Sequence, residues 1–326
     1  MKKIIILSTG GTIAMKYDEK IGANVPAVSG KELIAAIPSL KDAGDIEVVE
    51  FSNIPSPHMT PKLMLDLRDK IDELLEDETI TGLVVTHGTD TLEETAYFLD
   101  LTLKTDKPVV LTAAMRSADE IGSDGPVNLL SSVRTAADFN SKAKGVLVVL
   151  NQQVHKAKDV TKTHTGNIDT FKSPFWGPIG YVDTDKIIWN NIPIREERYS
   201  VKSIEIDDVH LVKMTAGASS LIIDTLVENN VSGIVIEAFG RGNVPPNIMT
   251  GIEKAIEKKI PLVISSRCLG GRPLGIYGYA GGGGTIANLG GILAGDLNGQ
   301  KARIKLIVAL NSENYKYENL NKYFDN

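Results

Sequence analysis

The chain has 326 residues, with 35 lysines and arginines against 41 aspartates and glutamates, and a formal net charge of −6. At about 150 residues per domain, this length suggests two domains or one large one. No block of basic residues appears, which argues against a nucleic-acid or anionic-membrane partner. A single cysteine, Cys268, excludes an internal disulfide, and five histidines without an HExxH pattern argue against a metal site. We expect no metal and no cofactor.

The N-terminal segment has only part of the pattern of a signal peptide. Two lysines precede Ile4–Leu7, but four apolar residues are fewer than the 7–15 of a signal peptide. No stretch approaches 18 consecutive apolar residues, the length expected of a transmembrane helix. The sequence therefore predicts a cytoplasmic protein that has no membrane partner.

Short apolar runs alternate with amphipathic stretches through the first half of the chain. The expected strands are Ile4–Ser8, Ile46–Phe51, Gly82–Thr86, Pro108–Thr112 and Val146–Leu150. The expected helices are Ser29–Ile37, Thr60–Glu76, Thr91–Thr102 and Pro126–Asn140. This alternation predicts a parallel sheet with right-handed crossovers and helices on both faces. Such sheets bind ligands beyond the carboxyl ends of their strands.

The second half begins irregularly and then becomes regular again. Residues 151–198 suggest hairpins followed by a linker at 183–200. Beyond it we expect strands at His210–Met214, Gly233–Ala238 and Leu262–Ser265, and helices at Ser219–Asn229, Pro246–Lys259, Thr285–Ala294 and Ala302–Leu310. The predicted fold class is α/β: a larger N-terminal doubly wound, mostly parallel sheet domain (1–182), the linker, and a smaller C-terminal α/β domain (201–326).

The first candidate motif, STGGTIA at Ser8–Ala14, directly follows the first expected strand. Its glycines permit a sharp turn at the strand's carboxyl end. A phosphate-binding turn is disfavoured, because neither the GxGxxG nor the Walker spacing is present. What remains is the hydroxyl of Thr12 beside free backbone amides, a combination that suits a nucleophile and an oxyanion site.

The second motif, THGTDTLEETA at Thr86–Ala96, also runs from a strand end into a helix. A simple N-cap with acidic residues in the first turn accounts for Asp90 or Thr91. It does not account for the further hydroxyl of Thr89 at the same sheet edge as Thr12.

The third motif is DVTKT at Asp159–Thr163. A lysine in such a loop is usually a solvated surface charge, but desolvation can lower a lysine pKa from about 10.4 and make the amine a base. The flanking residues His87, His155 and His164 are expected to be structural hydrogen-bonding groups. Together the motifs predict a hydroxyl-based site that uses no histidine.

These three stretches together resemble the bacterial L-asparaginase (asparaginase/glutaminase) family. The similarity extends to Val235–Pro245 and Ser265–Arg267, and so spans essentially the whole chain. It implies a two-domain α/β amidohydrolase that converts L-asparagine to L-aspartate and ammonia through a threonine acyl-enzyme.

The resemblance also implies roles for individual residues. Thr12 matches the primary nucleophile, and Thr89, Asp90 and Lys162 match a second triad. Asp90 further matches the group that binds the substrate α-ammonium, and Ser56 the group that holds its α-carboxylate. Backbone amides near Thr12 and Thr89 match the oxyanion hole, and Gly11, Gly88 and Thr89 are further expected to bind substrate.

The segment Met15–Val28 matches a lid that closes over the substrate. The family usually carries a tyrosine near the position of Asn24–Pro26, where this chain has none, and Tyr17 is a candidate substitute. In addition, Pro57 stands where many members have a substrate-binding glutamine. The loss of its donors and acceptor leaves the choice between asparagine and glutamine open.

The family also implies a homodimer or homotetramer, with active sites between paired subunits. Many secreted members supply a glutamate from the neighbouring subunit, but the matching stretch Leu274–Gly284 has no carboxylate. Asn243 is a candidate intersubunit substrate contact.

Other functions remain as alternatives. The amidase subunit of a tRNA-dependent amidotransferase shares these catalytic segments but needs a further domain. A non-catalytic amino-acid-binding protein with two α/β lobes has no need of Thr12, Thr89 and Lys162 together. A nucleotide-binding function is disfavoured because both phosphate fingerprints are missing.

Overall fold

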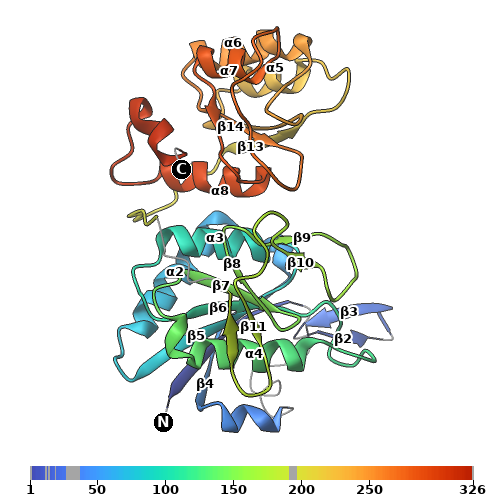
Figure 1. Ribbon diagram of the computed structural model, residues 1–326, viewed down its shortest axis with the longest axis vertical. Helices are drawn as coiled ribbons and strands as arrows, with labels where there is room; N and C mark the ends of the chain where they lie inside the picture. The colour runs from blue at the N-terminus through green and yellow to red at the C-terminus, as the bar shows by residue number, and fades with distance from the viewer. Residues whose placement is uncertain are drawn as a thin grey trace. The chain divides into compact units, whose positions relative to one another are not determined.

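A computed structural model describes residues 2–11, 13, 15–18, 20–26, 37–190 and 197–324, apart from the side chains of 15–18, 23–26, 41 and 42 (Figure 1). It divides into two units, Met1–Arg198 and Tyr199–Asn326. Most of the helix expected at Ser29–Ile37 lies outside the described residues. Within the described residues, no helix is long and apolar enough to cross a membrane.

The first unit is built on an eight-stranded sheet with the order β12-β11-β8-β7-β6-β5-β1-β4. Five strands form a parallel block. They are β4 (Asp45–Ile54), β1 (Lys3–Gly10), β5 (Ile80–Thr86), β6 (Val109–Thr112) and β7 (Val146–Leu150). An antiparallel extension follows, made of β8 (Gln153–Lys156), β11 (Gly180–Val182) and β12 (Ile187–Trp189). The sheet is therefore mostly parallel, as predicted.

Helices cover both faces of this sheet. On β1, Ile4 and Ile6 enter a core cluster with α4 (Gly125–Ala137), whereas Ile5 and Leu7 enter a second cluster with α2 (Pro61–Leu75) and α3 (Leu92–Thr102). Alternate residues of a strand point to opposite faces, so a continuous apolar run is what a doubly covered strand requires. The predicted doubly wound architecture is confirmed.

Smaller elements complete the first unit. β2 (Met15–Asp18) pairs with β3 (Ala23–Pro26) in an antiparallel hairpin that places Tyr17 opposite Asn24. β9 (Thr161–Lys162) pairs with β10 (Phe171–Lys172). The remaining elements are the 3-10 turns η2 (Pro38–Asp42), η3 (Ser56–His58) and η4 (Phe139–Ser141).

The second unit holds a four-stranded, all-parallel sheet in sequential order. Its strands are β13 (Val209–Lys213), β14 (Gly233–Ala238), β15 (Leu262–Ser266) and β16 (Ile292–Leu293). Its helices are α5 (Leu221–Glu228), α6 (Met249–Glu257), α7 (Gly283–Leu289) and α8 (Gly299–Leu310), with η5 (Pro246–Ile248) and η6 (Tyr317–Tyr323). It is the smaller α/β unit that the sequence predicts.

Two expected boundaries are wrong. The helix expected at Thr285–Ala294 ends at Leu289, because Gly290 adopts a left-handed conformation with φ +114°, and the chain then enters β16. Part of the expected linker, Ile187–Trp189, instead forms an edge strand of the first sheet. Backbone pairing with β11 makes this segment a strand, and local composition carries little information on such pairing.

Candidate active site

Three turns pack against one another at the carboxyl ends of β1, β4 and β5. Gly11, with φ +86°, follows β1, and a Cβ there would lie 2.4 Å from the backbone nitrogen of Gly88. A Cβ on Gly88 would in turn lie 2.7 Å from the Oγ of Ser56. Glycines at both positions therefore allow backbone turns from three strands to meet.

The side chain of Lys162 joins two groups from the second motif. Its Nζ donates to Thr89 Oγ1 at 2.9 Å and to Asp90 Oδ1 at 2.7 Å. Thr89 is 7% exposed, whereas the side chain of Asp90 is 60% exposed. Among the described residues, no acceptor for the hydroxyl proton of Thr89 occurs.

Lys162 is held by local strand pairing rather than by a flexible loop. β9 places it opposite Phe171 of β10, and the hydroxyl and amide of Thr163 both donate to the carbonyl of Thr170. The lysine side chain is 17% exposed. The usual case of a solvated loop lysine therefore does not apply at this position.

Ser56 lies in η3, directly after β4, and is 5% exposed. Its Oγ accepts from the amide of Asp90 at 3.2 Å, and its carbonyl accepts from Thr91 Oγ1 at 2.7 Å. No acceptor for the Ser56 hydroxyl proton occurs in the part of the chain that the structure describes. Ser56 thus joins η3 to the second motif through two hydrogen bonds.

The buried side chain of His87 stabilises this turn through two hydrogen bonds. Burial lowers the pKa of its imidazole to about 4, so the ring is neutral at pH 7. Because a carbonyl can only accept, Nδ1 carries the proton and donates to the carbonyl of Gly88 at 2.8 Å. Nε2 then accepts from Thr95 Oγ1 at 3.1 Å. The tautomer is fixed, and the predicted structural role of His87 is confirmed.

A cavity of about 280 Å³ opens beside these groups. It is lined by Asp90, Lys162, Thr163, His164 and Thr165. His164 Nδ1 accepts from the amides of Gly166 and Asn167, each at 3.0 Å, so the ring caps its own loop. The cavity thus presents a carboxylate, an amine and hydroxyls to a small polar molecule.

The structure brings together Gly11, Ser56, Gly88, Thr89, Asp90 and Lys162. Thr12 lies outside the described residues, although its neighbours Gly11 and Ile13 are both buried. Tyr17 has a described backbone in β2, but its side chain lies outside the description.

Asn243 belongs to the second unit. Its Oδ1 accepts from the amide of Gly283 at 3.1 Å, at the first residue of α7. The side chain therefore caps that helix within its own unit.

Sequence reasoning missed a polar network at the carboxyl end of β6. The Asp124 carboxylate accepts from the amides of Met115 and Arg116, each at 3.0 Å, and from Asn128 Nδ2 at 2.9 Å. Asn128 also donates to the carbonyl of Ala113 and accepts from the amide of Asn151. The spacing of Asp124 and Asn128 on one helix face was the available signal, but their partners are distant in sequence.

This network adjoins the first motif. A Cβ on Gly125, the first residue of α4, would lie 3.2 Å from Cγ1 of Ile13. The side chain that follows Thr12 is therefore packed against the N-terminal end of α4.

An open α/β sheet with hydroxyl, amine and carboxylate groups gathered at its carboxyl edge is the architecture of a small-molecule enzyme site. Comparisons with known proteins specify it further. The family model "Asparaginase, N-terminal" matches residues 3–195, and "Glutaminase/Asparaginase C-terminal domain" matches residues 208–324. The chain belongs to the bacterial asparaginase/glutaminase family.

Individual relatives agree. The chain is 37% identical over 311 residues to an L-asparaginase from Bacillus licheniformis, covering 95% of this chain and 96% of the relative. It is 39% identical over 317 residues to L-asparaginase 2 from Escherichia coli (strain K12), covering 95% and 89%. Among solved structures, a probable cytoplasmic L-asparaginase from Campylobacter jejuni superposes with a TM-score of 0.89 at 35% identity, covering 99% of both chains.

Proposed function

We propose that this protein is an L-asparaginase, which hydrolyses the side-chain amide of L-asparagine to L-aspartate and ammonia. The observation that carries the proposal is the bonding of Lys162 to both Thr89 and Asp90 at the sheet edge where the Gly11 turn packs. Relatives named L-asparaginase align over nearly the whole chain, which favours asparagine as the amide.

In the proposed mechanism, Thr12 attacks the carbonyl carbon of the substrate amide. Backbone amides near Thr12 and Thr89, at Gly11 and Gly88, stabilise the oxyanion that forms. The proton that the Thr12 hydroxyl loses passes to the leaving nitrogen, the C–N bond breaks, ammonia departs, and an ester remains on Thr12. Water then hydrolyses this ester and releases aspartate.

The second triad manages protons and holds the substrate. Lys162 orients the Thr89 hydroxyl, whose own proton is free for transfer. The exposed carboxylate of Asp90 binds the substrate α-ammonium, and the free hydroxyl proton of Ser56 is donated to its α-carboxylate. These groups bind the two charged ends common to asparagine and glutamine, so they do not discriminate by side-chain length.

The test is ammonia release from asparagine and from glutamine, measured on the wild type and on Thr12→Ala. We expect asparagine to be the better substrate and Thr12→Ala to lose at least about 10³-fold in kcat, because it lacks the nucleophile. No release from either amide would refute the proposal. A preference for glutamine would reassign the substrate that Pro57 leaves open.

The hairpin β2–β3 is proposed to act as the lid of this site, with Tyr17 as a catalytic candidate. Closure of such a hairpin would exclude water during acyl transfer. Hydrogen exchange with saturating aspartate should show added protection across residues 15–26. Unchanged protection there, with protection at residues 86–91, would remove the lid from the mechanism.

We propose a cytoplasmic location and no nucleic-acid or membrane partner, in keeping with the net charge of −6 and with the Campylobacter jejuni relative. Recovery of the activity in a periplasmic fraction would contradict this. We also propose a homodimer or homotetramer in which the C-terminal unit, with Asn243, contributes to a neighbouring subunit's site.

A further inference from the structure

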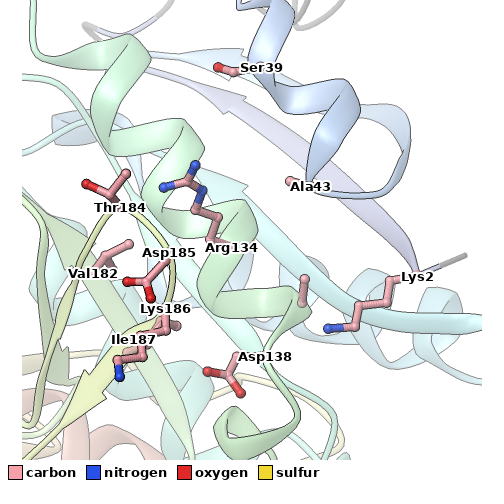
Figure 2. A pocket seen from close by; sticks show the side chains of 11 residues that line it. Lys2, Ser39, Ala43, Arg134, Asp138, Val182, Thr184, Asp185, Lys186 and Ile187 are labelled. Carbon is pink, nitrogen blue, oxygen red and sulfur yellow. The ribbon is translucent and has the colours of Figure 1, made fainter.

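A second, larger cavity occupies the first unit, with a volume of about 390 Å³ (Figure 2). Its lining residues come from the start of β1, the η2 segment, the end of α4 and the β11–β12 turn. They are Lys2, Ser39, Ala43, Arg134, Ala137, Asp138, Val182, Thr184, Asp185, Lys186 and Ile187. This volume falls within the range of about 300–1,000 Å³ that small-molecule sites occupy.

The cavity lies at the amino end of β1, whereas the proposed catalytic residues lie beyond its carboxyl end. Lys2 immediately precedes β1, whereas Gly11 follows it, and the eight residues of β1 span about 25 Å at ~3.3 Å per residue. None of the groups that bind substrate in the proposed mechanism lines this cavity. It is therefore a separate site.

Its floor is preformed. Ala137, Val182 and Ile187 are each 9% exposed or less and belong to the core cluster that packs under α4. The floor residues sit on a helix and on two paired strands, which fixes their positions before any ligand arrives.

The charges around this floor are of both signs, and the Asp138 carboxylate also attracts the ammonium group of Lys144. Lys2, Arg134 and Lys186 supply three cations, and Asp138 and Asp185 supply two carboxylates. Among the described residues, none of these five side chains has an ion-pair partner within 4.0 Å. Arg134 makes one long bond, 3.4 Å, to the carbonyl of Asp183, and Asp138 accepts the amide of Asn140.

We propose that this cavity binds an acidic amino acid. Arg134 and the two lysines would hold its two carboxylates, and Asp138 or Asp185 its ammonium group. The three cations and two carboxylates leave a charge of +1, which complements the −1 of such a ligand. A guanidinium can engage a carboxylate through two parallel hydrogen bonds, which favours Arg134 as the main anchor. The proposal uses no catalytic residue and does not depend on the proposed function.

Hydrogen exchange measured by mass spectrometry on the full chain tests this, with L-aspartate and succinate as probes. Succinate keeps both carboxylates and lacks the ammonium group. We expect L-aspartate to protect peptides covering residues 134–138 and 182–187 from exchange. Succinate should need an at least tenfold higher concentration to give the same protection. The catalytic peptides, 86–91 and 160–165, report separately on the active site.

Substitutions of the cavity cations test which side chains contact the bound amino acid. Arg134→Gln and Lys186→Gln should each weaken protection of the 182–187 peptide by about tenfold or more in aspartate concentration, since each removes a charged donor. Lys62→Gln, an exposed change on α2, should leave it unaltered. Both cavity variants should keep wild-type protection of the catalytic peptides.

Three results would overturn the proposal: no protection at residues 134–138 and 182–187 with aspartate, unchanged protection in both cavity variants, or equal protection by succinate. Cavity protection without any response in the catalytic peptides would count against the proposed function and would support the second site.

Discussion

At the scale of single residues, the site depends on one amine that bonds two oxygens. Lys162 as an ammonium donates to both Thr89 and Asp90, and it must lose a proton before it can act as a base. In either role it fixes the direction of the Thr89 hydroxyl. The methyl-ended side chain of methionine can do neither.

Lys162→Met should therefore lower kcat for asparagine by about 10²-fold or more, the usual scale of lost general-base assistance. The measurement is steady-state ammonia release. Lys172→Met is the matched control, since Lys172 lies on the paired strand β10 and bonds Asp169 instead. A kcat near that of the wild type for Lys162→Met would remove the lysine from the mechanism.

The buried imidazole of His87 makes folding stability depend on pH. Its pKa is lowered to about 4 in the folded state, from 6.5, so the unfolded chain binds the proton more readily between these values. Its contribution is complete above pH 6.5 and is lost as pH falls toward 4, by about 3 kcal/mol at most.

Urea unfolding between pH 4 and pH 7 would show this dependence. His87→Gln should flatten the slope, whereas His58→Gln, at an exposed position, should keep it. An identical slope in the wild type and His87→Gln would mean that other groups cause the acid destabilisation.

At the scale of elements, the site is a junction of turns whose backbones nearly touch. Gly11→Ala would place a Cβ 2.4 Å from the nitrogen of Gly88 and would also require φ +86°. We expect it to destabilise the fold by more than about 1 kcal/mol and to reduce activity, because the clash displaces backbone that carries Thr89.

Gly166→Ala is the control for that change, since a Cβ there meets nothing within 4 Å. Thermal unfolding and ammonia release should both be close to wild type for the control. Equal melting temperatures for Gly11→Ala and the wild type would show that the turns can separate without cost.

The Asp124 carboxylate holds the loop between β6 and α4 through two backbone amides and Asn128. Asp124→Asn should cost about 2 kcal/mol, because bonds to a charged acceptor are each worth about 1.5–3 kcal/mol and the amide offers one acceptor oxygen. Amide exchange at Met115 and Arg116 should rise. Glu120→Gln, which alters an exposed pair with Arg116, should leave that exchange unchanged.

At the scale of the whole molecule, each unit has its own sheet and core, and the second unit exposes large apolar side chains. Leu221, Leu269 and Ile276 are 70%, 69% and 58% exposed. In the oligomer that we propose, these side chains are candidates for the contact between subunits.

The proposed assembly therefore predicts a mass of two or four times 35.2 kDa by light scattering at micromolar concentration. Leu269→Lys should reduce this mass if it lies in the contact, whereas Lys62→Gln should not. A wild-type mass of 35.2 kDa would refute the oligomer.

Most of the first sheet could be predicted because its parallel strands are buried on both faces, and such strands are continuous apolar runs. The expected Gly82–Thr86 and Val146–Leu150 lie within or match β5 and β7. Short elements escaped prediction: β12 and β16 have two or three residues, too few for any periodic pattern.

The candidate site likewise has features that the sequence predicts and features that only the fold creates. The sequence by itself determined the family and the α/β class and predicted the chemical groups of the candidate site, because unbroken local motifs carry them. Only the tertiary structure decided that Lys162 reaches both Thr89 and Asp90, that Ser56 bonds the amide of Asp90, and that five charged side chains line a second cavity. Those facts depend on residues 34 to about 180 positions apart in the sequence, which only the folded chain brings close together.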